Sequence, residues 1–214
     1  MFTTKMEIGF QKEKVKWKIG IGLGKKNRIL IIFLQLFSSI VFSQEIENDT
    51  ILLWQLDRPL EWIDFQGKEK IEPNVTHKSD AVTSVKFLFI SMSNSEGIIY
   101  PYPVCYFLKN ISWTISNSTS LLNHEQTHFN ISELYARKIR KEFLELLKKE
   151  NIIQEDYEKI SNKYIKEVYE RHILYDEETV HGRIQEAQNE WDKKIRKELE
   201  ELKEFEFGPH KLSE

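Results

Sequence analysis

The first half of the chain consists of short apolar runs separated by turn-forming residues. Several runs are rich in β-branched and aromatic residues, and the run 81–90 alternates in part between apolar and polar positions, which is typical of strands. Pro101 and Pro103 cannot donate a main-chain hydrogen bond, so we expect the strand that contains them to lie partly at the edge of a sheet. The predicted strands are 51–54, 60–65, 81–90, 98–108 and 111–115.

The second half has a helical pattern. After Asn117 glycine nearly disappears, and Glu, Lys and Leu dominate. Apolar residues at helical spacing predict three helices, with breaks near Asn151 and within 173–176. The chain therefore predicts one α+β domain, in which a small antiparallel β-sheet (51–117) is followed by a layer of about three helices (118–205). The predicted helices are 118–149, 154–173 and 178–205.

The N-terminal region has the pattern of an export signal. Lys25-Lys26-Asn27-Arg28 precede an apolar run at 29–42, which has about the length of a signal-peptide core and is shorter than the ~20 residues that span a bilayer. We predict that residues 1–43 are a signal peptide with an extended n-region and that 44–214 form the mature domain. The protein would then be periplasmic or extracellular. If the segment is not cleaved, it would serve as an N-terminal membrane anchor.

Composition and charge narrow the range of functions. Hydrophobic residues make up 40% of the 214 residues and charged residues 30%, as in ordinary folded domains. A net charge of −3 leaves no basic field for nucleic acid or anionic lipid. The single cysteine, Cys105, rules out an intrachain disulfide. Because its neighbours are mostly apolar, we expect a buried structural thiol.

The strongest chemical signal is His124-Glu125-Gln126-Thr127-His128. Two histidines four residues apart on a helix lie on one face, one turn apart, so their imidazoles can converge on one ion. In this arrangement the glutamate acts as general base on a water bound to zinc. The sequence therefore predicts a zincin-like active helix with His124 and His128 as Zn²⁺ ligands and Glu125 as a catalytic residue.

A catalytic zinc site needs a third protein ligand. Glu133 lies about 140° around the helix from His128 and should point away from the metal. His181, at the start of the last predicted helix, is the best candidate. Asp176 is the alternative, either as a ligand or as a carboxylate that orients a ligating imidazole.

Two further predictions concern residues around this site. Tyr175 is either a donor to the oxyanion of a tetrahedral intermediate or a half-buried aromatic residue. His77, His172 and His210 have no partner pattern in the sequence, so we expect them on the surface.

Three segments of the chain resemble a bacterial family of predicted secreted zinc-dependent proteases, the domain-of-unknown-function family 922. They are 121–138, around the two histidines, 56–68, with its Arg-x-Leu-x-Trp-x-Asp-Phe-x-Gly stretch, and 175–182, with Tyr-Asp-x-x-Thr-x-His-Gly. The resemblance implies a zinc peptidase, with the histidines of the first segment as ligands and its glutamate as catalytic residue. It also implies His181 as a third ligand. The chain departs from the family pattern at Thr127, where glycine is usual, and at Asn130, where aspartate is usual.

These observations favour an exported zinc metallopeptidase of the His-Glu-x-x-His type, whose partners are peptide or protein substrates and not nucleic acids. Two alternatives remain open. One is a zinc-binding envelope or secreted protein without catalysis, and the other is a zinc amidase acting on a non-peptide amide. We also expect the strands within 82–108 to offer an edge that could pair with an extended peptide.

Overall fold

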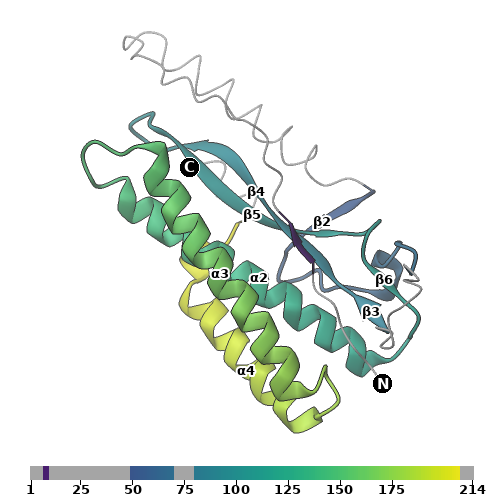
Figure 1. Cartoon of the computed structure of the whole chain (residues 1–214). Coiled ribbons are helices and arrows are strands. Elements are labelled where there is room, and N and C mark those ends of the chain that lie inside the picture. Colours follow the sequence, from purple (N-terminus) through teal and green to yellow (C-terminus); the bar gives the residue numbers. More distant parts are fainter. Residues whose placement is uncertain (1–6, 10–48, 70–79, 208–214) are drawn as a thin grey trace.

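The computed structural model describes residues 7–9, 49–69 and 80–207 (Figure 1). The apolar run of the predicted signal peptide, His77 and His210 lie outside the described residues. The architecture is α+β, as predicted, with small sheets followed by three long helices. The elements are β1 (Glu7–Gly9), β2 (Ile51–Leu53), η2 (Trp62–Asp64), β3 (Ala81–Val82), β4 (Ser84–Ser93), β5 (Ile99–Leu108), β6 (Trp113–Thr114), α2 (Thr119–Leu146), α3 (Gln154–Thr179), α4 (Gln185–Glu201) and η3 (Lys203–Phe205).

The larger sheet has the strand order β1-β4-β5-β2. β4 and β5 form an antiparallel hairpin, with Val85 opposite Phe107 and Ser93 opposite Ile99. β2 pairs antiparallel with β5, β3 pairs with β6, and β1 is parallel to β4. β1 lies within the segment predicted as a leader, so a mature chain starting near Gln44 would have β4 as an edge strand.

Within the described part of the sheet, the prolines of β5 lie where the strand has no second neighbour. β2 reaches β5 only over 106–108. The carbonyl of Pro103 accepts a hydrogen bond from Arg140 Nε of α2 at 2.7 Å. Since the nitrogen and carbonyl of one strand residue point the same way, the missing N–H of Pro103 costs no ladder hydrogen bond. The predicted edge position is confirmed.

The strand predicted over 60–65 is wrong, because Trp62–Asp64 forms a single 3₁₀ turn. Asp64 is buried and accepts a hydrogen bond from the backbone of Glu61 at 2.9 Å. It also pairs with Arg58 at 2.7 Å. A side chain that closes its own turn in this way competes with strand pairing.

A second feature of this segment explains its glycine. A Cβ on Gly67 would lie 2.8 Å from the backbone of Ile111 and from the carbonyl oxygen of Ser112. The Gly67 N–H donates to that Ser112 oxygen at 2.8 Å. Two backbone segments therefore cross in contact here, and only a residue without a side chain fits.

α2 is the central element, and it packs on β5 on one side and on α3 and α4 on the other (Figure 1). It begins after Ser118, whose side chain accepts a hydrogen bond from the backbone of Leu121, the usual role of an N-cap serine. Cys105 is fully buried beneath α2, as expected, and burial raises the pKa of its thiol. Among the described residues, no helix is both long and apolar enough to cross a membrane.

The break predicted within 173–176 is wrong, because α3 continues to Thr179. Val168, His172, Tyr175 and Thr179 are all buried. Their spacing of four, three and four residues is that of one helix face. The interruption between the last two helices instead lies at 180–184.

Candidate metal centre

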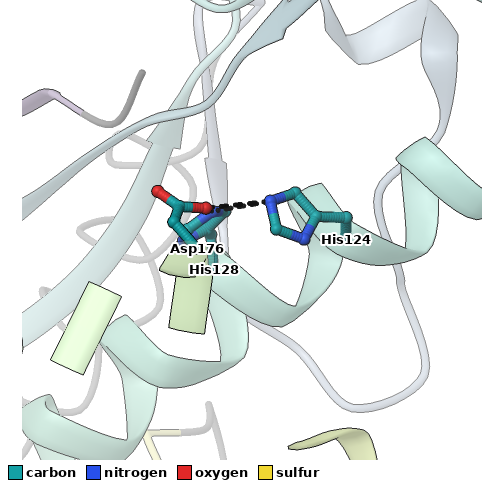
Figure 2. A group of neighbouring side chains, drawn as sticks. All are labelled: His124, His128 and Asp176. Atoms are coloured by element: carbon teal, nitrogen blue, oxygen red, sulfur yellow. Dashed lines mark hydrogen bonds and ion pairs between the residues drawn. The ribbon is translucent and has the colours of Figure 1, made fainter. Parts of the chain in front are cut away.

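α2 presents His124 and His128 one turn apart, as the sequence predicted. Both imidazoles are fully buried, and their Nε2 atoms lie 3.1 Å apart. Asp176, on α3, brings its Oδ1 to within 3.1 Å of His124 Nε2 and 3.0 Å of His128 Nε2 (Figure 2). Three donor atoms from two helices thus converge on one point.

These distances fit a metal ion. Four-coordinate zinc takes imidazole nitrogen and carboxylate oxygen at about 2.0–2.2 Å, which separates tetrahedral ligands by about 3.3–3.5 Å. The three donor atoms are 3.0–3.1 Å apart, so small shifts would accommodate the ion. The Asp176 carboxylate is largely buried, which opposes its ionisation, but the adjacent His128 and His124 imidazoles hold its pKa well below the ordinary value.

His181 does not join this group of three, although it borders it. Its Nδ1 lies 3.5 Å from Asp176 Oδ1, and its side chain is 30% exposed. Asp176, the alternative to His181 in the sequence, occupies the position of the third donor. His181 therefore lies next to the three donors, on the more exposed side of the site.

The turn that carries His181 has an unusual backbone. Val180, His181 and Gly182 have φ angles of 49°, 55° and 77°, so three successive residues adopt the left-handed conformation. This conformation is disfavoured for a β-branched residue such as Val180. A Cβ on Gly182 would lie 2.9 Å from both Cβ and Cγ of His124. The turn thus packs its glycine directly against the imidazole of His124.

The ring of Tyr175 packs against both imidazoles. Its ring stacks on that of His124, with centroids 4.6 Å apart, and meets that of His128 edge-on at 4.9 Å. The hydroxyl donates to Gln188 Oε1 at 2.6 Å, and burial raises its pKa. Tyr175 is fully buried, which corrects the expectation of an oxyanion donor. It is placed to position the histidines.

A polar network from α4 holds His124. Gln188 Oε1 lies 3.2 Å from His124 Nδ1, and Gln188 Nε2 donates to Asp192 Oδ1 at 2.7 Å. Asp192 also accepts from the Thr127 hydroxyl and from Asn123 Nδ2. Thr127, a departure from the family pattern, therefore contributes a hydrogen bond to the network behind His124.

The expectation that His172 is a surface residue is wrong. His172 is fully buried, and its Nδ1 lies 2.9 Å from His128 Nδ1. Burial, with a further contribution from His128, lowers the pKa of His172 well below the ordinary value. Its position four residues before Asp176 could have revealed it, because this spacing places both side chains on one face of α3.

Two buried glutamates of α2, Glu125 and Glu133, lie in different surroundings. Glu125 is fully buried, and its charge adds to the burial that raises the pKa of Tyr175. Glu133 is also buried, but it pairs with Arg137 at 3.0 Å and with Arg140 at 2.8 Å. Glu133 thus belongs to a separate ionic cluster, consistent with the prediction that it points away from the metal.

Asn130, the other departure from the family pattern, also lies outside the donor group. Its Oδ1 accepts hydrogen bonds from Trp54 Nε1 and from Gln126 Nε2, both at 2.8 Å. Gln126 Oε1 in turn accepts from the Leu60 backbone at 2.6 Å. This chain joins α2 to the N-terminal segment, and it requires only an acceptor oxygen at position 130.

This fold and this site define a class of protein. It is an α+β protein with a buried donor group of two histidines and one carboxylate. Residues 112–182 match the family model described as "Bacterial protein of unknown function (DUF922)". The match includes α2, α3 and all three donors, and it confirms the family resemblance for the segments 121–138 and 175–182. No curated protein and no solved structure gives a significant match.

Proposed function

We propose that this protein is a zinc-dependent hydrolase that cleaves peptide bonds. The observation that carries the proposal is the convergence of His124 Nε2, His128 Nε2 and Asp176 Oδ1 within 3.1 Å of one another, beside a glutamate that directly follows the first histidine. In this proposal the three converging residues hold Zn²⁺, and Glu125 is the catalytic residue.

The donor set supports a catalytic site more than a structural one. Structural zinc sites are mostly closed by four protein ligands, often with cysteine, whereas catalytic sites keep three protein ligands and one open position. The only cysteine, Cys105, is buried in the core away from the donors. Asp176 keeps 15% of its side chain exposed, while both histidines are fully buried, so the accessible side of the site is that of Asp176.

The residues around the donors have complementary roles. Zinc bound there would polarise a substrate carbonyl and lower the pKa of a water molecule to about 7. Glu125 would take the proton of the attacking water and deliver it to the leaving amine nitrogen. Tyr175 and Gln188 would keep the His124 ring in place throughout, because both contact it directly.

His181 favours a second candidate function. Its Nδ1 lies 3.5 Å from Asp176 Oδ1, close enough for a modest movement to make it a fourth ligand. A site closed by His181 would stabilise the protein without catalysis. The expected zinc amidase acting on a non-peptide amide would use the same residues as a peptidase and differs only in its substrate.

The proposed place of action is outside the cytoplasm. The support for it is the basic and apolar pattern of residues 25–42, which resembles an export signal. The net charge of −3 supports peptide or protein substrates and argues against nucleic acid as a partner.

Zinc content and hydrolysis together test the proposal. The full chain, dialysed after purification, should hold close to one zinc per molecule by elemental analysis. His128→Ala and Asp176→Ala should lose it, and Glu125→Gln should keep it while losing hydrolysis of a quenched peptide library. Absence of zinc from the wild type would refute the metal site. Zinc that persists in Glu125→Gln together with full activity would refute the role of Glu125.

His181→Ala separates the two candidate functions. If His181 only borders the site, the His181→Ala variant keeps its zinc, and the substitution affects its hydrolytic activity instead of its zinc content. If His181 closes the site, zinc content falls and the wild type is inactive toward all substrates. In the second outcome the binding protein without catalysis becomes the better assignment.

A further inference from the structure

Behind His128 lies a closed ring of three polar contacts. His128 Nδ1 lies 2.9 Å from His172 Nδ1, and His172 Nε2 lies 3.3 Å from Ser132 Oγ. The Ser132 hydroxyl returns to the carbonyl oxygen of His128 at 3.1 Å. All three residues are buried, so bulk water does not compete with these contacts.

The proposed metal site sets the direction of each hydrogen bond in this ring. A His128 ring that offers the lone pair of Nε2 to the metal carries its hydrogen on Nδ1. In the 2.9 Å contact between the two Nδ1 atoms, His128 is then the donor and His172 the acceptor. With its Nδ1 an acceptor, His172 carries its hydrogen on Nε2, which points to Ser132 Oγ. The Ser132 hydroxyl is then left to donate to the His128 carbonyl.

We infer that His172 is a positioning residue that, together with Ser132, holds His128 in the tautomer and ring orientation required for metal binding. The inference rests on the proposed metal site. His172 is not itself a ligand in this arrangement, because both of its nitrogens are occupied by His128 and Ser132. Partners of this kind typically change metal affinity by about 10–100-fold.

The position of His172 in the fold strengthens this inference. It lies on α3 four residues before Asp176, so a single helix face supplies both the third donor and the partner of the second. The His128 ring is also held edge-on by Tyr175, with centroids 4.9 Å apart. The contact at Nδ1 and the aromatic contact with Tyr175 together restrain rotation of the His128 ring about its Cβ–Cγ bond.

Nitrogen NMR tests the tautomers directly. Long-range ¹H–¹⁵N spectra of the full chain labelled at histidine distinguish protonated from unprotonated ring nitrogens. We expect His172 to be protonated at Nε2 only, and His128 to be protonated at Nδ1, with and without zinc. A His172 ring protonated at Nδ1 would overturn the inference.

Three variants test the effect on zinc affinity, measured by competition with a fluorescent chelator. His172→Phe keeps the bulk but removes the acceptor, and its zinc Kd should rise about 10–100-fold. His172→Asn places a carbonyl oxygen near the former Nδ1, so it should recover most of the lost affinity. Ser132→Ala removes the acceptor of His172 Nε2–H and should weaken zinc binding by a smaller factor.

Ser161→Ala is the matched control. Ser161 is a buried helical serine whose hydroxyl donates to the carbonyl four residues earlier, Tyr157 O, at 2.8 Å. Ser132 makes the same backbone contact, but Ser161 lies on α3 outside the ring. The control should leave the zinc Kd unchanged. If Ser132→Ala and His172→Phe also leave it unchanged in folded protein, the inference is wrong and the metal site stands.

The two proposals fail in different ways. If the wild type binds no zinc, the proposed function falls, and the nitrogen spectra of the zinc-free protein still decide the hydrogen-bond direction. If His172→Phe does not fold, as judged by circular dichroism, His172→Asn and Ser132→Ala carry the test. Equal zinc affinity of His172→Asn and His172→Phe would show that the acceptor is not what matters, and would overturn the inference.

Discussion

Gly182 offers a sharp test of how the turn after α3 shapes the metal site. A Cβ at this position would lie 2.9 Å from Cβ and Cγ of His124 and 3.1 Å from its Nδ1, well inside the normal carbon–carbon contact of about 3.5–4.0 Å. His124 cannot retreat freely, because its ring also stacks on Tyr175 at a centroid distance of 4.6 Å. Gly182→Ala should therefore displace the His124 imidazole.

Two effects add up in this variant. The φ of 77° costs a non-glycine residue about 1–2 kcal/mol, and overpacking in a filled site costs about 1–3 kcal/mol. We expect the free energy of unfolding to fall by about 2–5 kcal/mol in urea denaturation. Because His124 must move, the zinc Kd should rise as well, by at least tenfold.

Gly97→Ala separates the two effects. Gly97 has nearly the same φ, 79°, but a Cβ there would meet nothing within 4 Å. This control should lose only the backbone contribution of about 1–2 kcal/mol and keep wild-type zinc affinity. If both variants lose the same stability, or if Gly182→Ala binds zinc as tightly as the wild type, the contact with His124 does not constrain the site.

Three further predictions concern residues away from the donors. Glu133→Ala leaves the buried Arg140 without its carboxylate partner and leaves Arg137 with Glu206 alone. It should lower the free energy of unfolding by about 3–5 kcal/mol; a drop below 1 kcal/mol in urea denaturation would contradict this reasoning. Asn130→Asp keeps an acceptor for Trp54 Nε1, so elemental analysis should find its zinc content unchanged, and loss of zinc would place Asn130 in the metal site after all. Cys105 is 1% exposed and its thiol pKa is raised by burial, so iodoacetamide should label it only in denaturant, as read by mass spectrometry; rapid labelling of the native chain would show an open core.

The face of α2 that carries both histidines could be predicted because its signal is local. His124 and His128 are four residues apart, and helical geometry alone places both on one face. The β-sheet followed by three helices was also predictable, since the change from alternating to helical pattern at Asn117 is abrupt. The 3₁₀ turn at 62–64 was missed, because its cause is a set of contacts that Asp64 makes with Arg58 and Glu61.

The third donor could not be predicted with the same certainty, because it depends on how two helices pack. The sequence favours His181 because it opens the last predicted helix. A predicted helix that ends at 173 also separates Asp176 from the regular pattern of α3. Since the helix continues to Thr179, Asp176 shares a face with His172, and His181 falls in the turn beyond.

The same continuity explains why the site needs all three helices. α2 supplies the two imidazoles, but each exposes a second nitrogen that must find a partner in the buried interior. α3 supplies His172 as the partner of His128, and α4 supplies Gln188 as the partner of His124. An imidazole held at Nδ1 by a partner from another helix can only turn its Nε2 toward Asp176. The packing of the helical layer therefore determines the direction of the donors, and a sequence motif confined to α2 describes only half of the site.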